Sequence, residues 1–362
     1  MRQDTKAIFT PTRTDVPTAG LFPGVILYLT MFYGKRKIAV RVAYFFATSA
    51  ASGIAGGLVA YGISYMDYTA GWRAWRWIIL LNGIPTVLTA FVVPFVLPNS
   101  PETAKFLSEE DKRNMVKMRL KEMGRAHNAN NLVKSDVIDG LKDWTTWCYA
   151  LIQYCINNML YSFSVFLPTI INDMGQWTRA EVQAMTVPVY CAGAIIYVIN
   201  ARVSDQVQRR GYFTMISISV SIFGYCLLIA NQGTAMSYAG CFFVAMGLYS
   251  AGGIQLAWLT VNNPRYGKRA IMSGMQLTIG NAAGVASPWM FEGQYAPTYY
   301  PGYGATIALL VLGLGGMVTL HLHYKRENKK RERGERDYIL EGMPEDQVIE
   351  LGERAPSYRF TT

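Results

Sequence analysis

The side chains best suited to bind a small molecule are amides and aromatic rings set inside long apolar runs. In one run Gln153, Asn157 and Tyr161 follow one another at four-residue spacing, so a helix would place them on one face, with Asn158 beside them. Burying an unpaired polar group is costly, so such residues either contact a substrate or hydrogen-bond neighbouring helices together. Both interpretations hold for the further candidates in later runs, which are Tyr249, Gln255, Trp258, Gln276 and Asn281.

The sequence offers no set of residues typical of an enzyme, and we predict that the protein is not one. Its histidines are His127, His321 and His323, and the last two have no third metal ligand near them in the sequence. No phosphate-binding loop, nucleophile–base pair or zinc motif is present. We therefore predict no catalytic residues, no metal site and no cofactor.

Nine apolar runs have the length of a membrane-spanning helix, which is about 17–25 residues. None of the 34 Lys and Arg residues falls inside them, whereas a soluble helical core of this size would carry charges. The chain is therefore predicted to be an all-α, multi-pass membrane protein. The runs cover residues 18–33, 42–65, 77–97, 144–171, 182–200, 212–231, 237–262, 270–291 and 304–322.

The net charge of +10 reflects orientation in a membrane, and we expect no nucleic-acid partner. The basic residues gather in every second connection between the runs and in the C-terminal region. Because basic connections face the cytoplasm, the C-terminus is predicted inside and, with an odd number of spans, the N-terminus outside. We expect the protein in the plasma membrane, in contact with membrane lipid.

A polar stretch between the third and fourth runs divides the chain into unequal parts. The six runs after it correspond to one half of a two-bundle carrier, in which each half consists of two three-helix repeats. The three runs before it then correspond to one repeat. The stretch itself should contain an amphipathic helix from Lys112 to Met123, with Ser108 as its N-cap. The predicted segments are a disordered leader (1–17), a partial N-terminal bundle of three helices (18–98), a cytoplasmic linker (99–143), a six-helix C-terminal bundle (144–323) and a cytoplasmic basic tail (324–362). The basic cluster of the tail serves as a positive-inside stop signal or contacts anionic lipid.

Several segments, in order along the chain, resemble the major facilitator carriers of the fungal allantoate permease type. They are Gly20–Tyr33, Gly56–Ile63, Gly83–Thr86, Leu97–Lys105, Phe166–Ile171, Lys268–Ala270, Gly280–Asn281 and Ala296–Tyr299. The first of these is similar to the fourth helix of the family, and nothing in the sequence matches the first three. The resemblance covers about residues 18–324.

This resemblance implies a major facilitator fold without its first three helices, and a secondary carrier that works by alternating access. The implied substrate is a small organic anion or vitamin-like carboxylate of the allantoate, nicotinate or pantothenate class, moved by proton symport in the full-length form. Two positions depart from the family pattern. Asn82 stands where an acidic residue is usual, and Gln206 stands where the gating motif usually has arginine.

A second group of candidates lies in the stretch from Ser204 to Arg210, which resembles the gating motif of the superfamily. Asp205 can oppose a helix N-terminus, or pair with a neighbouring arginine, Arg209 or Arg210, and so close the cytoplasmic side. The alternative is a loop charge exposed to solvent.

No Lys, Arg, Asp or Glu lies within the predicted spans, although a buried organic anion needs a compensating charge and a proton symporter needs a titratable group. Two hypotheses follow. The chain is either a carrier whose N-terminal bundle is incomplete, or a non-transporting product, regulator or binding subunit of a full-length relative. In both cases we expect the N-terminal region to be more sensitive to proteases than residues 144–322.

Overall fold

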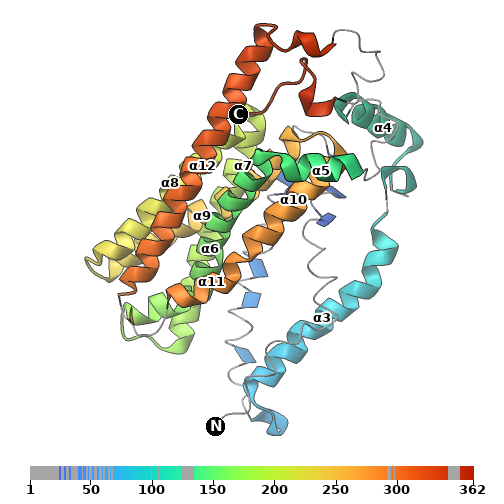
Figure 1. Ribbon diagram of the computed structural model, residues 1–362. Coiled ribbons are helices and arrows are strands. Elements are labelled where there is room, and N and C mark those ends of the chain that lie inside the picture. The colour runs from blue at the N-terminus through green and yellow to red at the C-terminus, as the bar shows by residue number, and fades with distance from the viewer. Residues whose placement is uncertain are drawn as a thin grey trace.

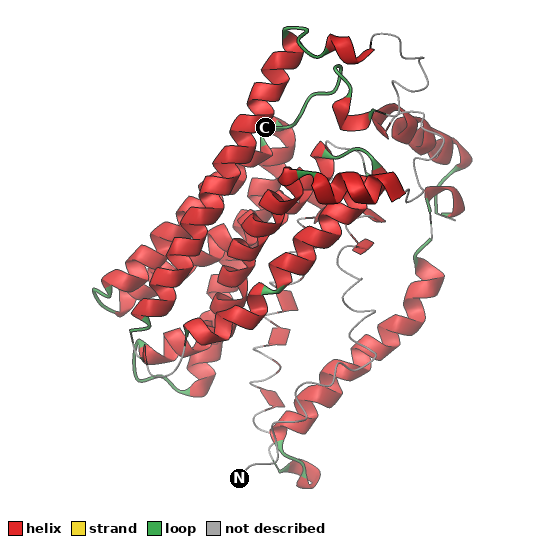
Figure 2. Cartoon of the chain, in the orientation of Figure 1, coloured by secondary structure: helices red, strands yellow, loops and turns green. Residues whose placement is uncertain are grey.

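The computed structural model of the protein describes residues 68–98, 100–104, 106–123, 134–291, 295–296, 298–340 and 351–362, together with scattered positions between 24 and 66. Within this part of the chain every regular element is a helix and none is a strand, as Figure 2 shows. The predicted leader, 1–17, lies outside the described residues, and the first two predicted spans are described only at scattered positions.

Over the described residues, 6 helices are long and apolar enough to cross a membrane. They are α3 (Ala74–Val96), α6 (Trp144–Asp173), α7 (Arg179–Val207), α8 (Arg210–Ala230), α9 (Thr234–Asn262) and α12 (Tyr300–Glu332). The prediction of an all-α membrane protein is confirmed. The predicted arrangement of three plus six spans is not observed as such, because the first two runs are described only in part and the eighth is broken.

The eighth predicted run forms two helices instead of one. α10 (Tyr266–Asn281) ends at the break, and α11 (Ala283–Met290) begins after Ala282, whose amide bonds back to two preceding carbonyls. Gly280 and Gly284 flank this point and lower the local preference for a continuous helix. In membrane carriers such interrupted helices occur where the substrate binds, because the ends of the half-helices expose polar groups.

The helices after the linker pack into one bundle (Figure 1). α9 lies against α6, α7 and α8, while α6 also packs on α10, α11 and α12. The approach of α8 to α9 depends on Gly247, because a Cβ atom there would lie 2.2 Å from the backbone oxygen of Ser217. Small residues allow such contacts in a membrane, where van der Waals packing between helices replaces the hydrophobic effect. Large side chains such as Tyr149, Phe163 and Trp258 fill the interior.

α3 stands apart from this bundle (Figure 1). No residue in its most apolar stretch is buried within the chain, and side chains such as Phe91 and Phe95 are largely exposed. In a membrane these side chains are open to lipid or to a further helix. The expected protease sensitivity of the N-terminal region stays a prediction.

Two helices lie in the linker. α4 (Glu109–Met123) covers the region where the sequence predicts a helix, and the Ser108 hydroxyl accepts a backbone amide three residues on at 3.1 Å. α5 (Lys134–Lys142) was not predicted, because 9 mostly polar residues give a weak helical pattern. It packs on α10 and is held there by an ion pair between Asp136 and Arg265.

The C-terminal region folds back onto the bundle, which the prediction of a basic tail did not include. α12 continues beyond the predicted end of its span, and residues 351–362 return to the end of the bundle where α6 begins and α9 ends. We call this the linker end. Charge patterns along a sequence report orientation in a membrane, so they give no sign of such a long-range contact.

Candidate substrate site and gate

A continuous chain of hydrogen bonds joins polar residues of α6 to those beside the helix break. The Gln276 amide donates to Gln153 Oε1 at 3.2 Å, and the Gln153 amide donates to Asn157 Oδ1 at 2.8 Å. The Asn157 amide donates to Asn281 Oδ1 at 3.1 Å, and the Tyr161 hydroxyl donates to the same oxygen at 3.0 Å. We call these residues the amide seam. The structure thus brings together more than half of the residues predicted to form a substrate site.

Local sequence explains how the seam forms. Gln153, Asn157 and Tyr161 lie on one face of α6, because four residues make about one helical turn. Gly280 lets α10 approach this face, since a Cβ atom there would lie 2.5 Å from Gln153 Cγ. Asn281 is the last residue of α10, so its side chain meets α6 at the break.

The seam is buried at one end and open at the other. Gln276, Gln153 and Asn157 are buried, Tyr161 is half-buried and Asn281 is exposed. Gln276 Oε1 has no hydrogen-bond partner among the described residues. Amides and a phenol offer donors and acceptors to a polar substrate, but they carry no net charge near neutral pH.

The other predicted site residues lie elsewhere in the bundle. Asn158 is fully buried, and neither polar atom of its side chain has a partner in the described part of the chain. Gln255 donates to a backbone carbonyl of α6 at 3.2 Å, and Tyr249 is buried where α7 meets α9. Trp258 lies at the linker end, where its indole Nε1 donates to a carbonyl of the C-terminal segment at 2.7 Å.

A second group of polar contacts joins residues before the linker to the bundle after it. Asp205, in the last turn of α7, pairs with Arg210 at 2.8 Å (Oδ1 to Nη2), and both side chains are buried. Asp205 Oδ2 accepts the backbone amide of Val40 at 2.9 Å. We call this arrangement of Val40, Asp205 and Arg210 the gate contact. Close by, Arg202 donates to the Tyr44 hydroxyl at 2.8 Å.

Asp205 makes one of the contacts that the sequence suggested for it, the ion pair with a neighbouring arginine. The pairing arginine is Arg210, which also donates to a backbone carbonyl of α9 at 3.1 Å, whereas Arg209 is the N-cap residue of α8. Val40 is helical, and its backbone amide donates to the Asp205 carboxylate. That a helix N-terminus faces Asp205 stays a prediction.

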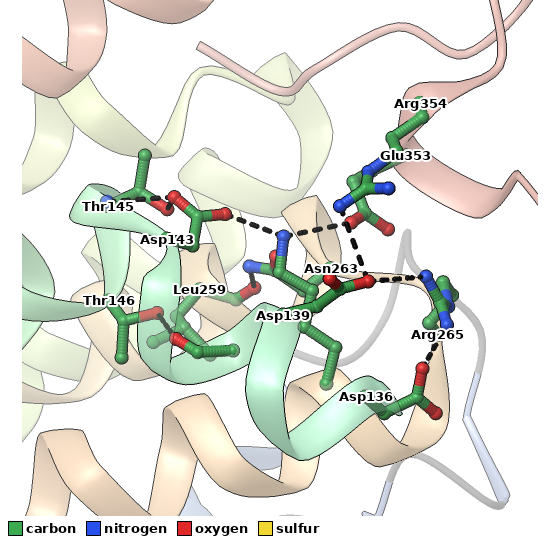
Figure 3. Close-up of polar contacts among 12 residues, drawn as sticks. Asp136, Asp139, Asp143, Thr145, Thr146, Leu259, Asn263, Arg265, Glu353 and Arg354 are labelled. Carbon is green, nitrogen blue, oxygen red and sulfur yellow. Dashed lines mark hydrogen bonds and ion pairs between the residues drawn. The ribbon is translucent and has the colours of Figure 1, made fainter. Parts of the chain in front are cut away.

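A charge cluster occupies the linker end (Figure 3). Lys268 of α10 donates to Asp143 Oδ2, at the N-cap of α6, at 2.6 Å and to Glu353 Oε1 of the C-terminal segment at 2.9 Å. Burial alone would raise the pKa of Asp143, but Lys268 and Thr145 hold it below its ordinary value. Burial would likewise lower the pKa of Lys268, but the two carboxylates hold it above its ordinary value. Sequence analysis missed this cluster because Lys268 lies 125 and 85 positions from its partners.

A helical bundle with an interrupted helix, a buried polar seam and a contact between its two parts has the form of a membrane carrier. A sequence model of the Major Facilitator Superfamily matches residues 16–288. The chain belongs to this superfamily, and it is an integral, multi-pass membrane protein. The superfamily expected from the sequence is thus confirmed, while the allantoate permease type stays a prediction.

Its curated relatives include fungal transporters. An uncharacterised transporter of Schizosaccharomyces pombe is 35% identical over 319 residues, which cover 87% of this chain and 62% of that protein. The high-affinity nicotinic acid transporter of Saccharomyces cerevisiae is 29% identical over 336 residues, which cover 93% of this chain and 60% of that protein. The chain therefore spans less than two thirds of the length of these relatives.

A solved structure shows the same fold. The proton:xylose symporter XylE, bound to 6-bromo-6-deoxy-D-glucose, aligns with a TM-score of 0.59 over 81% of this chain and 66% of that chain. The sequences are 14% identical, so the likeness concerns the arrangement of the helices.

Proposed function

We propose that this chain acts as a secondary active carrier of a small organic anion or vitamin-like carboxylate, of the allantoate, nicotinate or pantothenate class, by alternating access. The superfamily and the similarity to a nicotinic acid transporter support this proposal. The observation that carries it is the meeting of Asn157 and Tyr161 at Asn281, beside the interrupted helix. Carriers bind their substrates near the midplane, at such discontinuities.

The amide seam suits a carboxylate or carboxamide group. At its open end the Asn281 amide and the Tyr161 hydroxyl can donate to substrate oxygens, while Gln153 and Gln276 hold the donors in place from the buried side. Hydrogen bonds to a carboxylate are charge-assisted and stronger than those between neutral groups. Binding would exchange the bond from Tyr161 to Asn281 for bonds to the substrate.

Proton coupling and charge compensation belong, in this proposal, to the part of the full-length carrier that the chain does not span. A coupled carrier needs a titratable group within the membrane, and no Lys, Arg, Asp or Glu lies in the predicted spans of this sequence. The carrier in its coupled form would therefore combine the amide seam with ionisable groups from those other helices.

The gate contact closes the cytoplasmic side in this proposal. The basic connections support a cytoplasmic location of the linker end and the C-terminus, with the carrier in the plasma membrane. The amide of Val40 and the carboxylate of Asp205 then hold the two parts of the carrier together at that side. Opening toward the cytoplasm breaks this bond, while the pair between Asp205 and Arg210 stays within the C-terminal bundle.

A second candidate function is that of a non-transporting membrane protein, such as a regulatory or binding subunit of a full-length carrier. The observation that favours it is the exposure of α3, whose most apolar stretch buries no residue within the chain. A helix of this kind can pack against a partner in the membrane.

Uptake of radiolabelled nicotinate and allantoate by cells that express this chain alone tests both functions, with surface delivery measured by biotinylation. A carrier gives saturable uptake, which Asn281→Ala should lower by roughly tenfold because two hydrogen bonds and a donor are lost. Asn172→Ala changes an exposed amide at the C-terminal end of α6, outside the amide seam, and should leave uptake unchanged. No uptake despite delivery contradicts the carrier function for this chain, and saturable binding without uptake supports a binding subunit.

A further inference from the structure

The C-terminal segment, residues 351–362, crosses the linker end of the bundle and is held at two places. One is a groove between the ends of α9 and α12, and the other is the charge cluster. Between them lies a cavity of about 440 Å³. Glu353, Arg354 and Phe360 line it from the segment, and residues of α5, α10 and α12 line it from the bundle. The segment is therefore held at both places and borders this cavity, and Ala355 and Pro356 between them are buried as well.

In the groove, two asparagines bind the backbone of consecutive residues of the segment. Asn328 of α12 accepts from the Phe360 amide at 2.8 Å and donates to the Phe360 carbonyl at 2.8 Å. Asn262 of α9 accepts from the Thr361 amide at 2.8 Å and donates to the Thr361 carbonyl at 3.1 Å. In an extended chain the polar groups of one residue point to one side and those of the next to the other, as in a strand with two neighbours. The segment thus passes between α9 and α12 as an extended chain with hydrogen bonds on both sides.

Side chains add specificity to this backbone clamp. The Phe360 ring stacks on Tyr324 with ring centroids 4.6 Å apart, and the Arg331 guanidinium lies 4.5 Å from the centroid of the Phe360 ring. The Tyr358 hydroxyl donates to the Val261 carbonyl at 2.7 Å. Backbone hydrogen bonds combined with a side-chain pocket are the features by which proteins recognise extended peptides.

The other end of the segment is held by charge. Glu353 is buried and accepts from Lys268, while Arg331 donates to the backbone carbonyls of Glu353 and Tyr358 at 2.9 Å each. Lys268 also bonds Asp143 at 2.6 Å. Because that second bond remains when the segment leaves, the lysine keeps a counter-ion, and the contact with Glu353 can be made and broken without an unpaired charge.

We propose that the groove between the ends of α9 and α12 is a peptide-binding site whose occupant is the chain's own C-terminal segment, and that its docking clasps the linker end of the bundle. The clasp joins α9, α10 and α12 through residues outside the amide seam and the gate contact. α9 also supplies the backbone carbonyl that receives Arg210, so the clasp and the gate contact act on the same helix. The inference goes beyond the proposed transport function and does not depend on it.

Amide hydrogen exchange of the full chain in lipid nanodiscs tests the docking. The amides of Phe360 and Thr361 should exchange at least about tenfold more slowly than in a free synthetic peptide of residues 351–362. Phe360→Ala removes the stacked ring and should bring their exchange to within about twofold of the free peptide. Ser357→Ala changes an exposed residue of the same segment and should leave the protection unchanged. Both variants keep the sequence of the bundle, and amide exchange within α6 and α9 checks that its folding is unchanged.

The chain that carries Phe360→Ala also tests the site directly, because its groove is vacated. A fluorescein-labelled peptide of residues 351–362 should bind this chain saturably, and the same peptide with Phe360→Ala should bind at least about tenfold more weakly. Exchange of the wild-type segment at the rate of the free peptide would overturn the proposal. Equal binding of the two peptides, or no binding of either, would overturn it as well.

Discussion

The backbone amide of Val40 donates to the Asp205 carboxylate at 2.9 Å, so a residue before the linker is held by one that follows it 165 positions later. Beside this bond Val42 packs on Val261 of α9. The bond comes from the backbone amide of Val40 and does not involve its side chain. Substitution of Val40 therefore leaves the gate contact in place, and its strength is tested at Asp205.

Asp205→Asn removes the charge that faces buried Arg210. We expect the free energy of unfolding to fall by about 3–5 kcal/mol, because breaking a buried ion pair leaves the remaining charge poorly compensated. Thermal unfolding in detergent measures the effect, with Glu110→Gln in the exposed first turn of α4 as the control. In the double variant with Arg210→Gln, the loss of unfolding free energy should be smaller than the sum of the two single losses by at least about 1 kcal/mol. Additive losses would show that the pair contributes nothing.

Gly280→Ala places a methyl group where α10 meets α6. The new Cβ atom would lie 2.5 Å from Gln153 Cγ, so we expect a loss of about 1–3 kcal/mol in unfolding free energy from overpacking. Gly304→Ala is the control, because a Cβ atom there meets no atom within 4 Å and alanine favours a helix. Equal melting temperatures for the two variants would mean that the amide seam does not require this close approach.

Spacing along one helix predicted three of the five residues of the amide seam as one group, because Gln153, Asn157 and Tyr161 follow the helical period. Their meeting with Gln276 and Asn281 depends on how α10 packs on α6, which no pattern within a single helix specifies. The eighth run was predicted as one span because its apolarity continues across Ala282. Apolarity does not reveal the local hydrogen bonds that end α10 and begin α11.

Trp258 shows a different limit of sequence analysis. An aromatic residue in an apolar run suggested a substrate contact. In the structure its indole donates a hydrogen bond to the carbonyl of Thr361, 103 positions away. The folded C-terminal segment, residues 351–362, has no helical or strand periodicity, so its contacts arise only from tertiary packing. The ion pair within the gate contact was more predictable, because Asp205 and Arg210 lie five positions apart.

Acid should weaken the charge cluster at a pH set by Asp143. Its pKa is lowered, so its stabilising contribution is complete above the ordinary value of 3.8 and is lost as pH falls through the lower folded value. The pKa of Lys268 is raised, so its contribution is complete below 10.5 and is lost as pH rises through the higher folded value. Stability from this pair is therefore constant between these limits.

The measurement is the melting temperature between about pH 3 and pH 7. Asp143→Asn should lower it near neutral pH and reduce the further loss below about pH 4, whereas Asp111→Asn, in the exposed first turn of α4, should leave the profile unchanged. Parallel profiles for the wild type and Asp143→Asn would contradict the role of Asp143.

Tyr161→Phe separates the two interpretations of the amide seam, as a substrate site or as a bond between helices. The change removes a single donor at the open end of the seam and keeps the ring. For a substrate site we expect the Kd for nicotinate to rise by about three- to tenfold, the equivalent of one hydrogen bond. Equilibrium binding to the purified chain measures this, and Tyr300→Phe, at the exposed start of α12, serves as the control. A lower melting temperature with an unchanged Kd would instead identify the bond from Tyr161 to Asn281 as one that only fastens α6 to α10.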